Sequence, residues 1–152
     1  MLCRTKNMST MSRREARETV LGLLFETEFR ADESSTEIFA ISQEDREIPA
    51  DPYVEKAYFT ICENREEIDA MIGKYAKGWK TSRLSKLSRS ILRLAVYEMM
   101  YETEMPYSVS INEAVELAKK YDEDRARPFI NGVLNAVKNE LESAGGATEE
   151  TK

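Results

Sequence analysis

The chain has 152 residues, 41% of them hydrophobic and 33% charged, and its 22 Lys and Arg against 28 Asp and Glu give a formal net charge of −6. This length favours a single domain, and the acidic total argues against a nucleic-acid partner, because phosphate neutralisation requires Lys and Arg. The sequence contains no histidine, which excludes His-containing metal sites, Ser-His-Asp triads and Cys-His catalytic pairs.

The first part of the chain shows a helical pattern followed by an acidic stretch. Ser12 and Glu15 have the spacing of a capping box. The apolar residues that follow share one helix face: Ala16, Val20, Leu23 and Leu24. Residues 31–51 carry seven carboxylates against one arginine and are predicted to form a connection with at most a short helix.

The next helical stretch, residues 52–77, begins with Asp51 as an N-cap and Pro52 at the first helical position. Asn64 and Glu67 have the spacing of a further capping pair, so the sequence leaves open whether this stretch is one kinked helix or two. The apolar residues of its second half share one face: Ile68, Met71, Ile72 and Tyr75.

A helix predicted over residues 88–102, capped by Ser88, is apolar nearly all round from Ile91 to Met100. A helix of this composition is expected at the centre of a hydrophobic core. Glu98 lies on its apolar side, where a carboxylate needs a partner. We interpret Glu98 as a hydrogen-bonded structural residue, because an acid/base role would lack a companion.

Two more helical segments precede the C-terminus. Ser110 and Glu113 form another capping pair, and Pro128 is suited to start the last helix. The inward face of that helix is apolar: Phe129, Ile130, Val133, Leu134, Val137 and Leu141. Residues 143–152 are predicted to form a disordered tail, and residues 1–11 a flexible extension.

No stretch shows the alternation of a half-buried strand, so we predict an all-α fold of six or seven helices, with one helical domain over residues 12–142. Cys3 and Cys62 have no metal-ligand spacing and favour a reducing, cytoplasmic location. No apolar stretch is long enough to span a bilayer or resembles a secretory signal. The glycines match neither nucleotide-binding fingerprint, and no cofactor is expected.

The charge is divided into large opposed blocks. Residues 1–17 carry five basic groups against one acidic group, and residues 71–93 carry seven basic groups and no carboxylate. Residues 31–70 carry twelve acidic and three basic groups, and residues 94–124 carry eight acidic and two basic groups. The small net charge therefore hides two cationic segments.

The cationic segments have a geometry suited to phosphates. Lys86, Arg89 and Arg93 fall within about 60° of one another on their helix and are predicted to project outward. The first helix carries three arginines in its opening turns: Arg13, Arg14 and Arg17. Cations at a helix N-terminus oppose the helix dipole, a cost that is easier to explain if the arginines meet anions.

Two interpretations of these segments stay open. One is phosphate binding by a discontinuous cationic surface, and the other is a solvated face that binds nothing. Three aromatic residues near the basic segments are either platforms on which bases stack or core residues: Phe25, Tyr75 and Trp79.

Four segments of the chain resemble the NusB family of transcription antitermination factors, in the family's order and spacing. They are RREARE at 13–18, RSILRLAVYEM at 89–99, PYSVSINEAVELAKKY at 106–121 and FINGVL at 129–134. The resemblance covers residues 12–141, and its middle and last segments are the most specific.

The resemblance implies a fold of two small three-helix bundles and a non-enzymatic role. Family members pair with NusE, which is also a protein of the small ribosomal subunit. The pair binds the single-stranded boxA element of nascent RNA and helps RNA polymerase read through terminators, notably on ribosomal RNA operons. The sequence leaves open whether the free protein is a monomer or a homodimer that masks its RNA surface.

The cationic segments and the resemblance together predict nine RNA-binding residues: Arg13, Arg14, Arg17, Phe25, Lys86, Arg89, Arg93, Arg125 and Arg127. Phe25 stands where tyrosine is common in the family, and Glu15 interrupts the arginine cluster where some members have a third arginine. The segment 126–128 (Ala-Arg-Pro) replaces the usual Ser-x-Lys, and its neighbouring arginines are expected to supply the charge instead.

The NusE surface is expected around the helices at 88–102 and 107–121. One alternative function is a protein-interaction module of the same fold with weak or no RNA binding. Another is an enzyme, because ribosomal RNA methyltransferases carry this fold as an N-terminal domain, but the chain leaves no room for a methyl-donor-binding domain.

Overall fold

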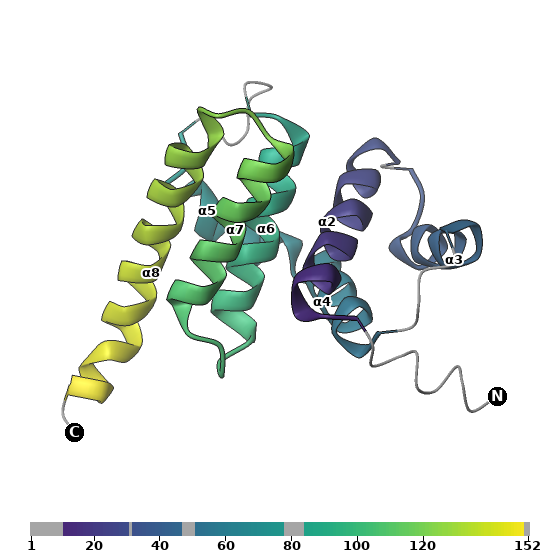
Figure 1. Cartoon of the computed structure of the whole chain (residues 1–152). Coiled ribbons are helices and arrows are strands. Elements are labelled where there is room, and N and C mark those ends of the chain that lie inside the picture. Colours follow the sequence, from purple (N-terminus) through teal and green to yellow (C-terminus); the bar gives the residue numbers. More distant parts are fainter. Residues whose placement is uncertain (1–10, 31, 47–50, 78–83, 151–152) are drawn as a thin grey trace. The chain divides into compact units, whose positions relative to one another are not determined.

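The computed structural model describes residues 11–30, 32–46, 51–77 and 84–150 (Figure 1). Within these ranges the chain forms seven α-helices and no strand, which confirms the predicted all-α fold. The sequence favoured one domain, whereas the chain divides into two compact units, residues 1–64 and residues 65–152. Among the described residues, no helix combines the length and the apolar composition that a membrane span requires.

The first unit is built from three helices: α2 (Arg13–Phe29), α3 (Ser35–Arg46) and α4 (Pro52–Glu63). The predicted capping box is present, because Ser12 Oγ accepts a hydrogen bond from Glu15 N and Glu15 Oε1 accepts one from Ser12 N. Asp51 caps α4 by accepting bonds from the N–H groups of Tyr53 (2.9 Å) and Val54 (3.1 Å). α2 packs against both other helices. The core is apolar: Val20, Leu23, Leu24, Ile38, Ala57 and Ile61.

The helix α3 is longer than predicted for this acidic stretch. Its start is capped by Ser34, whose Oγ accepts a hydrogen bond from Glu37 N (3.2 Å), while Glu37 Oε1 accepts one from Ser34 N (3.3 Å). Ile38 is fully buried, and the ring of Phe39 stacks on that of Tyr58 of α4, with centroids 5.9 Å apart. The expectation of at most a short helix is therefore wrong, because a narrow apolar face was masked by surrounding carboxylates.

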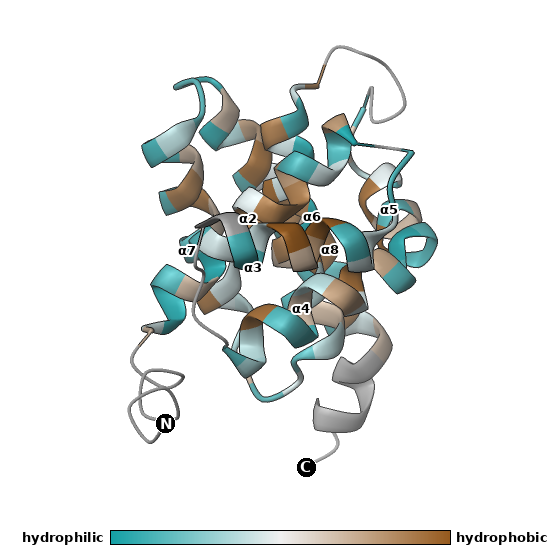
Figure 2. Cartoon of the chain, turned by 90° about the vertical axis from the view of Figure 1, so that its right-hand side faces the viewer, coloured by the Kyte–Doolittle hydropathy of each residue, from teal (hydrophilic) through white to brown (hydrophobic). Residues whose placement is uncertain are grey.

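The second unit is built from four helices: α5 (Arg65–Gly73), α6 (Lys86–Tyr101), α7 (Tyr107–Tyr121) and α8 (Ala126–Glu150). α6 packs against the other three, and residues 91–99 are all buried, which confirms its predicted central position. Figure 2 shows much of α6 in brown, the colour of hydrophobic residues. The stretch 52–77, which the sequence left open as one kinked helix or two, forms two helices, α4 and α5, that separate at Asn64, the C-cap of α4.

The helix α6 begins one turn earlier than predicted. Ser85, not Ser88, is its N-cap, and Ser85 Oγ accepts a hydrogen bond from Ser88 N (2.9 Å). The buried Ser88 hydroxyl instead donates to Asp122 Oδ2 (2.6 Å) at the end of α7. This bond places the start of α6 beside the end of α7.

The helix α7 also begins before its predicted cap. Pro106 occupies the N-cap position, where its fixed φ suits a helix start, so Ser110 lies inside the helix and is 2% exposed. Ser110 Oγ donates a hydrogen bond to Glu98 Oε1 (2.8 Å) on α6, and Glu98 is 1% exposed. The interpretation of Glu98 as a hydrogen-bonded structural residue is confirmed, and the capping role predicted for Ser110 is wrong.

We expect Ser110→Ala to lower the free energy of unfolding by about 1–3 kcal/mol, because it removes a donor from a buried carboxylate. Urea unfolding at neutral pH measures this loss. Ser108→Ala, at an exposed position on the same helix, is the matched control and is expected to change the value by less than about 0.5 kcal/mol. Equal losses for the two variants would contradict a structural role for the Ser110–Glu98 bond.

The predictions for the two ends of the chain have different outcomes. The predicted extension falls almost entirely on residues 1–10, which lie outside the described residues. A disordered tail was predicted from residue 143, whereas α8 continues to Glu150. The two glycines in this segment each lower helix propensity by about 1 kcal/mol, but they keep their N–H groups and do not block helical hydrogen bonds as proline would.

Candidate nucleic-acid interface

The first turn of α2 places two arginines at the surface. Arg13 and Arg14 are both exposed. The Arg13 Cζ atom lies 4.2 Å from the centroid of the Tyr53 ring, a cation–π contact that ties the start of α2 to α4. Arg17, one turn further along, is only 5% exposed. Of the three arginines predicted to face RNA on this helix, Arg13 and Arg14 therefore lie where a ligand can reach them, and Arg17 is buried.

The other end of α2 carries an exposed aromatic pair. Phe25 is 37% exposed and Phe29 is 62% exposed, so the Phe25 ring is partly accessible rather than a core residue. The two ring centroids lie 4.9 Å apart in an edge-to-face arrangement, with the planes inclined by 71°. The sequence interpretation missed Phe29, although its spacing of four residues from Phe25 predicts contact on a helix.

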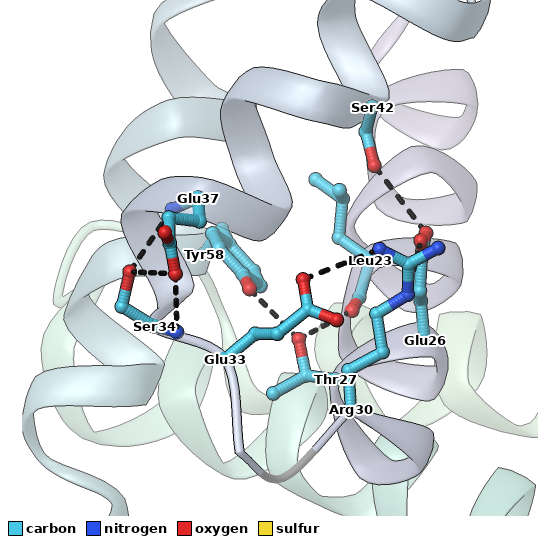
Figure 3. A network of polar contacts seen from close by, with 9 residues as sticks. All are labelled: Leu23, Glu26, Thr27, Arg30, Glu33, Ser34, Glu37, Ser42 and Tyr58. Atoms are coloured by element: carbon cyan, nitrogen blue, oxygen red, sulfur yellow. Dashed lines mark hydrogen bonds and ion pairs between the residues drawn. The ribbon is translucent and has the colours of Figure 1, made fainter.

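A polar network holds this end of α2 against α3 and α4 (Figure 3). Thr27 Oγ1 lies 2.7 Å from Tyr58 Oη of α4, and it also donates to the carbonyl oxygen of Leu23 (2.7 Å). On the α3 side, Ser42 Oγ donates to Glu26 Oε1 (3.3 Å). Burial raises the pKa of the Tyr58 hydroxyl well above its ordinary value, so this group stays neutral and hydrogen-bonded at physiological pH.

Four of the predicted cations gather at one end of the second unit. Lys86 is exposed and Arg89 half-buried in the first turn of α6. Arg125 lies in the connection between α7 and α8, and Arg127 lies in the first turn of α8; the Ser88–Asp122 bond holds the start of α6 next to that connection. Figure 1 shows the start of α6 and the connection between α7 and α8 at the same end of the bundle. Residues far apart in the sequence thus bring four cations to one end of the unit, together with the carboxylates of Asp122, Glu123 and Asp124.

Arg125 and Arg127 are both close to carboxylates of the connection between α7 and α8. Arg125 Nε lies 2.9 Å from Glu123 Oε1, and the Arg125 side chain is 89% exposed. Arg127 Nη2 lies 3.6 Å from Asp124 Oδ1. Exposed pairs of this kind contribute about 0–1 kcal/mol, so a phosphate can compete with these carboxylates for the guanidinium groups.

Arg93 does not project outward as predicted. It is 5% exposed, and it forms a bidentate ion pair with Asp69 of α5: Nε to Oδ1 at 2.8 Å and Nη2 to Oδ2 at 3.1 Å. The helical wheel put Arg93 on the same side as Lys86 and Arg89, but α5 covers that position. The structure therefore uses Arg93 to join α5 to α6.

A second contact of the basic segment 71–93 joins the residues directly after α5 to α8. Lys74 Nζ donates to Glu140 Oε2 (2.6 Å), and Tyr75 Oη donates to Glu140 Oε1 (2.5 Å). The hydrogen bond from Lys74, followed by that from Tyr75, holds the pKa of Glu140 below its ordinary value. Of the two interpretations left open for Tyr75, the core position is wrong, because α5 ends at Gly73 and the Tyr75 side chain is 38% exposed.

We expect the Glu140 contacts to stabilise the protein at neutral pH and to be lost in acid. Because the folded pKa of Glu140 is lowered, the stabilisation is fully present above the ordinary value of 4.5 and is lost as the pH falls through the folded value. Unfolding of the wild type and of Glu140→Gln, compared at about pH 7 and about pH 3, measures the effect. The difference between them should shrink in acid, while Glu142→Gln, at an exposed position on the same helix, should show no such change. A pH-independent difference for Glu140→Gln would contradict the assignment.

The exposed cations and the exposed aromatic ring described above can bind a polyanion non-covalently, with no catalytic step. Exposed guanidinium and ammonium groups bind phosphates independently of sequence, and an exposed aromatic ring stacks on an unpaired base. Five aromatic or cationic residues of the predicted segments lie outside the described residues: Arg4, Lys6, Trp79, Lys80 and Arg83.

Residues 14–139 match the NusB family. The chain belongs to the NusB family. It is 43% identical to the transcription antitermination protein NusB of Acetivibrio thermocellus over 143 residues. This alignment covers 90% of this chain and 95% of that protein. It is 40% identical over 132 residues to the NusB protein of Bacillus pumilus, with 86% of this chain and 98% of that protein covered.

Solved NusB structures share the fold of this chain. NusB of T. maritima aligns with a TM-score of 0.72 and 34% identity, covering 85% of this chain and 92% of that one. A crystal structure of the antitermination factors NusB and NusE in complex with dsRNA aligns with a TM-score of 0.74 and 31% identity, covering 84% of this chain and 96% of that one. The family resemblance of the four sequence segments is thereby confirmed.

The NusE surface was predicted on both α6 and α7, but in this NusB-family chain the middle of α6 is not accessible to a partner. Residues 91–99, the middle of the predicted segment 88–102, are all buried. On α7, by contrast, Val109 is 39% and Tyr121 is 47% exposed, and Glu116 is exposed between them. The accessible part of the predicted partner surface therefore lies on α7.

Proposed function

We propose that this chain is a transcription antitermination factor that binds the single-stranded boxA element of nascent RNA together with NusE, a protein of the small ribosomal subunit. It acts in the cytoplasm, within the RNA polymerase antitermination complex, and promotes read-through of ribosomal RNA operons. Its role is binding rather than catalysis.

The observation that supports this proposal most strongly is the exposure of Arg13, Arg14 and Phe25 on one helix of a NusB-family chain. The arginines supply phosphate contacts, and the ring supplies a stacking surface, which is how proteins recognise single-stranded RNA. The four cations at the end of the second unit add a further phosphate-binding region. A relative with the same fold has been solved with NusE and dsRNA.

The uneven charge distribution supports two different partners. RNA is attracted to the cationic segments and repelled by the acidic remainder, so the opposed blocks orient it. The segment 94–124, with eight acidic and two basic groups, includes α7 and suits a basic protein partner such as a ribosomal protein.

Transcription by RNA polymerase through a terminator tests the proposed function. On a template with boxA upstream of the terminator, and with the other factors of the complex present, the chain and NusE together are expected to raise read-through. A template with a scrambled boxA is the control and should show no increase. Equal read-through on the two templates would contradict the proposal.

A further inference from the structure

We propose that Tyr53 is a positioning residue for RNA binding: its ring orients the Arg13 guanidinium at the start of α2 without neutralising the positive charge. This inference rests on the proposed function. It extends that function to a residue of α4 that lies in neither basic segment and in none of the four segments that resemble the family. The group that binds the oriented guanidinium is a backbone phosphate of the RNA.

The contact between the two side chains is the first support. Arg13 is exposed, and its Cζ atom lies 4.2 Å from the centroid of the Tyr53 ring. A guanidinium is attracted to the negative face of an aromatic ring and stacks readily on it. Because this contact uses the face of the ring and no oxygen acceptor, the N–H donors of the exposed guanidinium remain available to a phosphate, which they can bind in a bidentate way.

The Tyr53 ring is itself fixed, which is the second support. Tyr53 lies in the first turn of α4 and is 8% exposed. Asp51 Oδ1 accepts hydrogen bonds from the N–H groups of Tyr53 (2.9 Å) and Val54 (3.1 Å), and Val54 is 1% exposed. The capped turn and the buried neighbour leave the backbone of Tyr53 little freedom. Arg13 is therefore ordered by a rigid group before RNA arrives, and less side-chain entropy is lost on binding.

The start of α2 is capped in the same way, which is the third support. Ser12 Oγ accepts a hydrogen bond from Glu15 N (3.1 Å), and Glu15 Oε1 accepts one from Ser12 N (3.0 Å). Glu15 is the acidic residue nearest to Arg13 in the sequence, but its carboxylate is engaged in this capping box, and residues two apart do not face each other on a helix. In the part of the chain that the structure describes, no carboxylate forms an ion pair with Arg13.

Comparison with Arg125 and Arg127 shows why an aromatic contact matters here. Arg125 Nε lies 2.9 Å from Glu123 Oε1, and Arg127 Nη2 lies 3.6 Å from Asp124 Oδ1. A carboxylate orients an arginine but offsets its charge, and a phosphate has to compete with it. An aromatic ring orients the arginine and leaves the charge in place, so the attraction for the RNA backbone is kept.

Equilibrium titration of a fluorescently labelled boxA RNA with the full chain and NusE tests the inference. Tyr53→Leu is expected to weaken binding roughly fivefold, because Arg13 must then be ordered during binding. Tyr53→Phe keeps the ring face and is expected to bind within about twofold of the wild type. Phe59→Leu, the matched control, removes a half-buried ring of the same helix that packs on Phe39 and Tyr58, and it should also stay within about twofold of the wild type.

A double-mutant cycle separates a positioning role from a general loosening of the first unit. Arg13→Ala alone is expected to weaken binding roughly tenfold, because one charge-assisted phosphate contact is lost. If Tyr53 acts through Arg13, Tyr53→Leu added to Arg13→Ala causes no further loss, so the two effects are not additive. A loss by the same factor in both backgrounds would overturn the inference.

Nuclear magnetic resonance of the wild type tests the contact without any substitution. In the free protein, the ring current of Tyr53 is expected to shift the Arg13 side-chain protons upfield, and the shift should persist when boxA RNA and NusE bind. Random-coil positions in the free protein, or a shift that disappears on RNA binding, would show that Tyr53 does not hold Arg13 for the phosphate.

The outcomes distinguish this inference from the proposed function. RNA affinity that Tyr53→Leu leaves unchanged, or that Tyr53→Phe lowers as much as Tyr53→Leu does, would overturn the inference alone. A loss in Phe59→Leu equal to that in Tyr53→Leu would have the same consequence. Absence of RNA binding by the wild type with NusE would overturn the proposed function and this inference together.

Discussion

Asp69→Ala is expected to lower the free energy of unfolding by about 3 kcal/mol, because it leaves the buried Arg93 guanidinium without its carboxylate. Arg93 is 5% exposed, and its Nε and Nη2 atoms bind the two carboxylate oxygens of Asp69 at 2.8 and 3.1 Å. Removing one partner of a buried pair costs far more than the pair itself contributes, since the remaining charge stays desolvated. Urea unfolding followed by circular dichroism measures the loss.

Asp124→Ala is the matched control for this experiment. Its carboxylate also faces an arginine, Arg127, at 3.6 Å, but the Asp124 side chain is 99% exposed. An exposed pair of this kind is expected to change the free energy of unfolding by less than about 1 kcal/mol. A loss for Asp69→Ala no greater than that for Asp124→Ala would show that Arg93 is not held by a buried ion pair.

Arg13→Glu combined with Arg14→Glu is expected to weaken boxA RNA binding on the order of 100-fold, because two charge-assisted phosphate contacts become repulsive. The slope of log affinity against log salt should also fall, by at least about 0.7 for each lost contact with a single strand. Both residues are exposed, so the fold should be retained, and thermal unfolding of the variant checks this.

Lys56→Glu with Lys138→Glu is the control for the arginine reversals. It changes the net charge by the same amount at positions on α4 and α8 outside the predicted interface. This variant should keep most of the affinity and the wild-type salt slope. Similar losses in the two double variants would indicate a general effect of net charge and would contradict a specific site on α2.

Local sequence signals predicted most helices but not all of their ends. Ser12 and Asp51 cap helices where expected, because a side-chain acceptor next to free N–H groups is a local interaction. Ser34 and Glu37 form the same kind of pair at the start of α3, and the acidic composition of that segment obscured it.

The errors at α6 and α7 have one physical cause. Ser88 and Ser110 have the sequence spacing of caps, yet each hydroxyl bonds a carboxylate on another helix: Asp122 and Glu98 respectively. A serine that donates to a distant acid in the tertiary structure cannot be distinguished by local pattern from one that caps a helix. Only the position of Glu98 on an apolar helix face indicated from the sequence that this carboxylate needs a hydrogen-bond partner.

The candidate interface was predictable in composition and only partly in geometry. The surface positions of Arg13, Arg14 and Lys86 agree with the helical pattern. The burial of Arg93 depends on its ion pair with Asp69, which lies 24 residues away on another helix. No local sequence pattern predicts this ion pair. Phe29 was within reach of sequence reasoning, because its spacing from Phe25 places both rings on one side of α2.

The most direct test of RNA recognition by this NusB-family chain is an equilibrium titration of boxA RNA with the purified protein, with and without NusE. We predict saturable binding that NusE tightens, that added salt weakens, and that a scrambled boxA sequence reduces. Absence of binding at low salt with NusE present, or equal affinity for boxA and scrambled RNA, would contradict this function.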